Sequence, residues 1–171
     1  MESQTTSPGK FAISYGVILG VIMTLIGVLM YVTGMALELK QWPQYLYYLI
    51  FPIVIFYAIN KFKKENANLL SLGQAIKIGL VAAVISALVY GAYALLFNYV
   101  IDPDFMNKMM EATKDKLMEN PDMTEEMVEQ SMVFMEKLQN PLIGVAGWIA
   151  MSAIFGLIYS LIGGLIMKNE E

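Results

Sequence analysis

Four stretches of the chain run for twenty or more residues without a charged side chain, and each is long enough to cross a lipid bilayer as a helix. A bilayer core about 30 Å thick needs roughly 20 apolar helical residues to span it. The stretches cover residues 11–37, 41–60, 78–101 and 138–167. This pattern predicts an all-α, polytopic membrane protein with four transmembrane helices.

The composition agrees with a membrane protein and argues against enzyme chemistry. Of the 171 residues, 57% are hydrophobic and 15% are charged, which is outside the range of soluble domains. The chain has no cysteine and no histidine, and every basic residue is a lysine, so thiolates, imidazole bases and arginine clamps are absent. We therefore expect no catalytic residue, no cofactor and no metal site. The net charge of −4 argues against a nucleic-acid partner.

The lysines are distributed unevenly around the four stretches, which predicts the direction in which each one crosses the membrane. Short loops that are rich in lysine stay in the cytoplasm. One set of span ends carries Lys10, Lys61, Lys63, Lys64, Lys77 and Lys168. The segment 102–137 instead has ten acidic residues and four lysines. We expect the chain in the cell inner membrane, with both termini cytoplasmic and an extracytoplasmic helical insert between spans three and four.

These boundaries divide the chain into consecutive segments. They are a flexible cytoplasmic tail (1–10), the first span (11–37), the second span (42–60), a basic cytoplasmic loop and helix start (61–77), the third span (78–101), an extracytoplasmic acidic, Met-rich helical segment (102–140), the fourth span (141–167) and a cytoplasmic tail (168–171). The first stretch is far longer than the roughly 7 to 15 residues of the apolar region in a cleaved signal peptide, so we interpret it as a retained span.

Small residues recur at intervals of four in three of the predicted spans, a spacing that lets helix backbones approach closely in a membrane. They are Gly16 and Gly20 in the first span, Gly79, Ala83, Ala87 and Gly91 in the third, and Ser152, Gly156, Ser160 and Gly164 in the fourth. Three such stripes favour helix packing inside one chain, and the alternative is a face for a homo-oligomer.

Tyrosine and tryptophan side chains gather at the span ends that we assign to the outer face. Such amphipathic rings prefer the headgroup level of a bilayer. We interpret them as interface anchors, and a ligand-binding aromatic cup is the alternative.

A shift of 63 residues aligns the first span with the third and points to an internal repeat. Ala12 and Gly16 then align with Ala75 and Gly79. Two equivalent helical hairpins would resemble the parallel repeats of some transporters. The repeat therefore supports the alternative of a small transporter or channel subunit built from two helical hairpins.

The segment before the third span contains a helix-start signal and a lysine close to the membrane. Ser71 and Gln74 have the spacing of a capping box, in which each side chain pairs with a backbone N–H of the other residue. Lys77 follows one turn later, where its amine can reach the membrane surface. Gln74 and Lys77 are candidate contacts for a lipid headgroup or a substrate, against the simpler interpretation as a helix start and an interface lysine.

The acidic insert is predicted to form two amphipathic helices, roughly 104–119 and 124–139, which lie on the outer face or against each other. Its eight methionines include two M-x-x-M pairs, a spacing that suits Cu(I). Methionine is also an adaptable filler of apolar faces and partner-binding surfaces, and no histidine or cysteine accompanies these pairs. We therefore favour packing or partner binding over copper.

Several of these features together resemble a known family. They are Ser71, Leu72, Gly73, Gln74, Ala75, Lys77 and Gly79 at the start of the third span, Asp102, Pro103, Asp104 and Phe105 after it, the charged Met-rich insert and the Gly-rich last span. This combination resembles a bacterial membrane protein family known as domain of unknown function 4199, over nearly the whole chain after Lys10. The resemblance implies a four-span inner-membrane protein, and it implies no activity and no site residue.

The leading hypothesis is a non-enzymatic scaffold or accessory subunit of the inner membrane. Its partners would be the lipid bilayer and a membrane or extracytoplasmic protein. We expect the outer amphipathic helices to contact that protein or the membrane surface, because they are the only large polar element of the chain. The transporter or channel subunit is the alternative.

Overall fold

The computed structural model describes residues 7–170, which form six α-helices and one short π-helix and contain no β-strand. The elements are α1 (Pro8–Val32), α2 (Trp42–Glu65), α3 (Leu72–Leu96), the π-helix η1 (Phe97–Ile101), α4 (Phe105–Met118), α5 (Glu125–Leu138) and α6 (Pro141–Met167). Four helical segments are long and apolar enough to cross a membrane, namely α1, α2, α3 continued by η1, and α6. The predicted all-α class with four spans is confirmed, and the chain is a multi-pass membrane protein.

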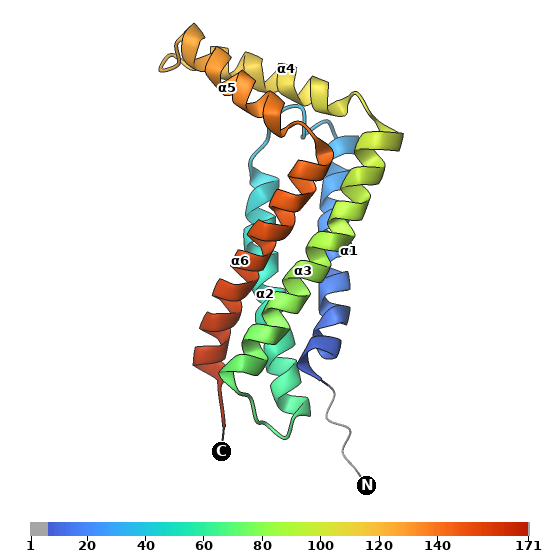
Figure 1. The fold of residues 1–171 in the computed structure, drawn as a ribbon, viewed down its shortest axis with the longest axis vertical. Helices are drawn as coiled ribbons and strands as arrows, with labels where there is room; N and C mark the ends of the chain where they lie inside the picture. Colours follow the sequence, from blue (N-terminus) through green and yellow to red (C-terminus); the bar gives the residue numbers. More distant parts are fainter. Residues whose placement is uncertain (1–6, 171) are drawn as a thin grey trace.

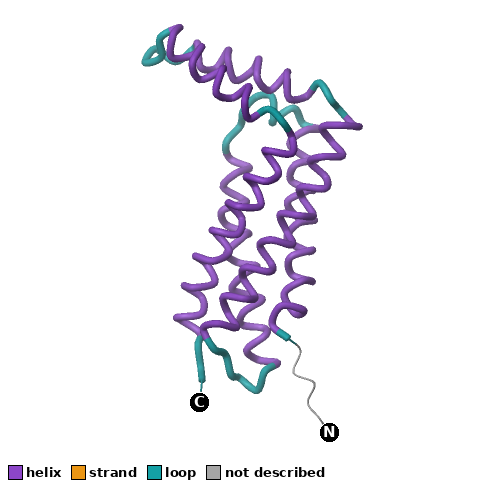
Figure 2. The backbone as a smooth tube through the Cα atoms, viewed as in Figure 1, coloured by secondary structure: helices purple, strands orange, loops and turns teal. Residues whose placement is uncertain are grey.

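The four long helices form a bundle, and the hairpin of α4 and α5 lies across one of its ends (Figure 1). The opposite end holds the start of α1, the loop between α2 and α3, and the end of α6 (Figure 2). Leu70 in that loop exchanges two backbone hydrogen bonds with Asn169, with N to O distances of 2.7 and 2.9 Å. The described ends of the chain therefore lie at the end of the bundle that faces away from the insert.

Side-chain and backbone hydrogen bonds explain where the long helices begin. Ser7 caps α1 by accepting a hydrogen bond from the Lys10 backbone N–H at 3.3 Å. Asn140 caps α6 in the same way through the Leu142 N–H at 2.9 Å, and proline occupies the first turn of both helices. Proline suits that position because its missing N–H would have no helical partner.

The structure differs from the predicted segments near the ends of the first span. Residues 8–10, predicted as part of a flexible tail, form the first turn of α1, and residues 1–6 of that tail lie outside the described residues. The helix ends at Val32, whereas the apolar stretch continues to Leu37. Gly34 has a φ of +74°, a left-handed conformation that ends the helix and that glycine adopts without strain.

Helix α3 is the centre of the bundle, because it packs along α1 on one side and along α6 on the other, while α2 contacts these helices more sparsely. This packing is unequal in the two hairpins of the proposed repeat. Gly16 faces α3 at Ala82 and Ile85, but its repeat counterpart Gly79 faces α6 at Ser160. The aligned residues therefore have different neighbours.

Candidate functional site

The small residues of the three stripes lie at helix crossings inside the chain. A Cβ atom added to Gly79 would overlap the Ser160 side chain, and one added to Gly156 would overlap Ala83. Ala87, Ser152 and Ser160 are buried. A Cβ atom added to Gly91 would lie 2.8 Å from a side-chain carbon of Val145, and one added to Gly164 would lie 2.8 Å from a side-chain carbon of Leu72. Gly16 and Gly20 bring α1 against α3, where Cβ atoms would meet the Ala82 and Ser86 carbonyl oxygens at 2.7 and 2.9 Å. All ten residues thus contribute to packing within one copy of the chain.

Gln74 and Lys77 lie on the first turns of α3 but perform separate roles there. The Gln74 Oε1 atom accepts a hydrogen bond from the Ser71 N–H at 2.9 Å, and the Gln74 N–H donates to Ser71 Oγ at 3.2 Å. This is the predicted capping box. Lys77 is exposed, and its Cε would lie 3.3 Å from a Cβ placed on Gly9 of α1. Its aliphatic stem therefore covers the first turn of α1.

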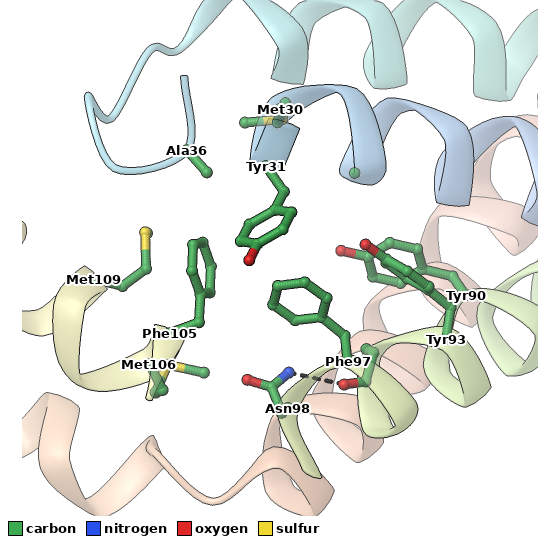
Figure 3. Close-up of a pocket in the computed structure, with 12 residues that line it drawn as sticks. Met30, Tyr31, Ala36, Tyr90, Tyr93, Phe97, Asn98, Phe105, Met106 and Met109 are labelled. Carbon is green, nitrogen blue, oxygen red and sulfur yellow. Dashed lines mark hydrogen bonds between the residues drawn. The ribbon is translucent and has the colours of Figure 1, made fainter. Parts of the chain in front are cut away.

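A cavity of about 260 Å³ lies where α1, α3, η1 and α4 meet, at the same end of the bundle as the hairpin (Figure 3). Its lining consists of Gly27, Met30, Tyr31, Ala36, Tyr90, Tyr93, Ala94, Phe97, Asn98, Phe105, Met106 and Met109. The Tyr31 ring lies 4.8 Å from the Phe97 ring and 5.5 Å from the Phe105 ring, in edge-to-face geometry. Aromatic rings from three elements thus meet in one cup, the arrangement given above as the alternative to separate interface anchors.

Asn98 supplies the one amide group in the lining of this cavity. Its Nδ2 atom donates to the Ala94 carbonyl oxygen at 2.8 Å (Figure 3). Because a carbonyl oxygen can only accept a hydrogen bond, the amide must turn its NH₂ group toward Ala94. The Oδ1 atom then points away from Ala94. Oδ1 is buried and has no hydrogen-bond partner among residues 7–170. Buried polar atoms without a partner are rare in proteins, and Asn98 also lies in a π-helical turn, a feature that recurs at functional sites.

Asp102, which follows η1, joins the bundle to the hairpin. Its Oδ2 accepts a hydrogen bond from the Tyr31 phenol at 3.2 Å, and its Oδ1 forms an ion pair with Lys108 Nζ at 3.2 Å. The hydrogen bond to Asp102 raises the pKa of the Lys108 ammonium above its ordinary value of 10.5. Further along α4, Lys116 Nζ donates to the Leu39 carbonyl oxygen at 3.3 Å. The pairing of Asp102 with Tyr31 was not predicted, because the two residues lie 71 positions apart in the sequence.

Helices α4 and α5 pack against each other along their methionine-rich faces. Val128 is buried between them, and a groove of about 430 Å³ opens beside it, lined by Lys114, Met118, Glu125, Val128, Glu129 and Met132. Near the bundle, Gln139 Nε2 donates to Asn107 Oδ1 at 2.8 Å and closes the hairpin. Met106, Met109, Met110 and Met135 line a further cavity of about 220 Å³ between the two helices. Members of both predicted M-x-x-M pairs thus lie in the contact between α4 and α5.

Comparisons with curated proteins and with solved structures found no match. A family described as Protein of unknown function (DUF4199) matches residues 14–169, which is nearly the whole chain. The match covers α1 from residue 14 onward, the other three long apolar helices and the acidic insert between the last two of them. The chain therefore belongs to this family of unknown function, and its fold is a four-span helical bundle with a helical hairpin at one end.

Proposed function

We propose that this protein is a non-enzymatic scaffold or accessory subunit of the inner membrane, and that it binds a protein partner in the groove between α4 and α5. The observation that carries the proposal is the composition of this groove. Val128 and Met132 are its more buried lining residues, and the exposed residues around them are Met118, Lys114, Glu125 and Glu129. An apolar floor with two glutamates and one lysine around it carries a net negative charge, which suits a partner segment that presents an apolar side chain beside a lysine or arginine.

Contacts between α4 and the bundle hold the groove in one position. The Tyr31, Asp102 and Lys108 contacts fix the start of α4, and the contact of Lys116 with Leu39 fixes its later turns. A rigid surface loses less conformational entropy on binding than a mobile one, and this favours a role in recognition. Methionine side chains adapt to the shape of a partner, which suits an accessory protein that contacts another subunit.

The proposal is tested by photo-crosslinking in native membranes, with a crosslinking amino acid placed at Met118 on the edge of the groove. We expect a discrete crosslinked protein, and its yield should fall at least about fivefold when Glu125 and Glu129 are both changed to glutamine. The variant E119Q/E126Q removes the same charge outside the residues that line the groove and is the matched control.

A crosslinking yield in the E125Q/E129Q variant that stays equal to that of the natural protein would contradict binding in the groove. An equal loss in both variants would indicate attraction by overall negative charge, which also contradicts the proposal. Both outcomes are interpretable only if the hairpin remains folded, which circular dichroism and hydrogen exchange of α5 amides can verify.

The outer cavity supports a second candidate function, the binding of a small molecule. The specific observation is the buried Asn98 Oδ1 atom, which lacks a donor within the described part of the chain. A neutral ring with one hydroxyl group would fit into a cavity of about 260 Å³ and could donate to this atom. Phenol should then bind more tightly than anisole, which lacks the donor, and N98L should remove this preference.

The packing gives less support to the alternative of a transporter or channel subunit. The two helical hairpins pack unequally, and within residues 7–170 the buried polar side chains are Ser86, Ser152 and Ser160. Substrate flux in proteoliposomes that is abolished by K77A would nevertheless establish transport and overturn the accessory role.

A further inference from the structure

The hairpin has a second exposed apolar surface, which the groove does not use. Met127, Phe134 and Leu138 are 47%, 63% and 48% exposed. At 3.6 residues per turn, these positions fall within an arc of about 40° on α5. They form a stripe along the helix. We call this stripe the lower face, because it points toward the bundle.

The direction of the lower face follows from the geometry of two antiparallel helices, which are related by a twofold axis perpendicular to their common plane. On α4, Phe105 packs on the bundle and Lys116 contacts Leu39, so this face points toward the end of the bundle. Going along α4 in the chain direction, the face of Phe105 and Lys116 comes about 100° of helical rotation before the face that contacts α5. On α5, the stripe of Phe134 precedes the face of buried Val128 by the same amount. The twofold axis therefore places both faces on the same side of the hairpin.

The apolar stripe of α5 thus points in the direction of the bundle, yet about half of the surface of its three side chains stays uncovered by the described part of the chain. Figure 1 shows that the tip of the hairpin extends beyond the edge of the bundle. The stripe continues into the exposed side chain of Leu142 at the start of α6, which belongs to the surface that lipid surrounds. Trp42 and Tyr99 are also exposed at this end of the bundle and mark the headgroup level.

We infer that the outer leaflet of the membrane covers the lower face, with Phe134 and Leu138 buried among the lipid headgroups and upper acyl chains. The stripe carries no charge, whereas Glu125, Glu129 and Glu136 point to the opposite side of α5. Binding is therefore driven by apolar burial and requires no anionic lipid. The inference rests on the membrane placement and on the hairpin of the proposed function, and it assigns lipid to one side of the hairpin and protein to the other.

Site-directed spin labelling tests this assignment, and the natural chain is suited to it because it contains no cysteine. Single cysteines replace Phe134 or Leu138 on the lower face and Glu129 or Glu136 on the opposite face. Each labelled protein is reconstituted into phosphatidylcholine vesicles. Collision with oxygen, which concentrates in lipid, and with a water-soluble nickel chelate is then measured.

We expect the labels at 134 and 138 to collide several-fold more with oxygen and less with nickel than the labels at 129 and 136. Equal nickel access at all four sites would overturn the inference, because the lower face would then lie in water. Shielding of 134 from both reagents would also overturn it, because protein and not lipid would cover the face. The L138C protein keeps the test valid if F134C unfolds. Purified protein is used without a partner, so failure of the groove experiment would not affect this result.

Discussion

The phenol of Tyr31, in the last turn of α1, donates a hydrogen bond to Asp102 Oδ2 at 3.2 Å, across 71 positions of sequence. The same carboxylate holds Lys108 of α4 at 3.2 Å. A single carboxylate therefore links the end of a membrane span to the first helix of the hairpin. The angle between hairpin and bundle depends on this link and on the adjacent contact of Tyr31 with Phe105.

The Y31F variant removes the hydrogen bond and keeps the ring contacts. We expect a loss of about 1.5–3 kcal/mol in the free energy that holds α4 on the bundle, as for a hydrogen bond to a charged acceptor. Hydrogen exchange should become faster at α4 amides and remain unchanged in α3 and α6. Uniform acceleration in all helices would contradict a local role for Tyr31.

The Gly79 position should tolerate no larger residue, because a Cβ atom there would overlap Ser160. We expect G79A to reduce the free energy of unfolding in mixed micelles by about 1–3 kcal/mol, as overpacked sites do. Gly147 on α6 is the matched control, because no atom lies within 4 Å of a Cβ added there. G147A should be neutral, or more stable by up to about 1 kcal/mol from helix propensity. Equal effects of the two changes would contradict the observed crossing of α3 and α6.

The ion pair of Lys108 with Asp102 predicts a pH dependence at high pH. The hydrogen bond to Asp102 raises the pKa of Lys108 in the folded protein above 10.5. A raised pKa means that the ammonium stabilises the folded hairpin below the unfolded-state pKa, and that this stabilisation disappears as pH rises through the folded-state pKa. Titration of the Lys108 side chain by NMR should show a lower pKa in the D102N variant. An unchanged pKa in D102N would contradict the pairing.

The capping box predicts that Gln74 acts on the start of α3. S71A should destabilise the protein by about 1 kcal/mol, because an N-cap side chain is lost. Q74A removes the reciprocal bond to the Ser71 N–H and should cause a similar or smaller loss. Thermal unfolding of both variants and of K77A measures these effects, and K77A, which touches no capping group, serves as the control. A larger effect for K77A would show that the packing of its aliphatic stem on α1 stabilises this end of the bundle more than the capping box does.

The distribution of lysine predicts the orientation of the chain in the membrane. Reporter fusions after residue 120, in the loop between α4 and α5, and after the C-terminus should be active on opposite sides. We expect the fusion at 120 outside the cytoplasm and the C-terminal fusion inside it. Reporters active on the same side would contradict an even number of membrane crossings.

Part of the site could be anticipated from local sequence. The capping box of Ser71 and Gln74 depends only on residues three apart, and the structure contains it. The hairpin helices were predicted from their amphipathic spacing, and α4 and α5 form within the predicted segment. An aromatic cup was only the alternative to interface anchors, and the place of Asn98 in it was not predicted, because the lining comes from residues 27–109 on four different elements.

The sequence by itself determined that this protein has four membrane helices and an acidic helical insert, because lipid requires an apolar length of about 20 residues and backbone hydrogen bonds close within each helix. Only the tertiary structure decided which helices pair. A helix that is apolar all round carries little information about which side faces a neighbour. Three features depend on contacts between residues that are distant in the sequence, and such contacts form only when the helices pack. They are the different partners of Gly16 and Gly79, the cup at Tyr31 and the two sides of the hairpin.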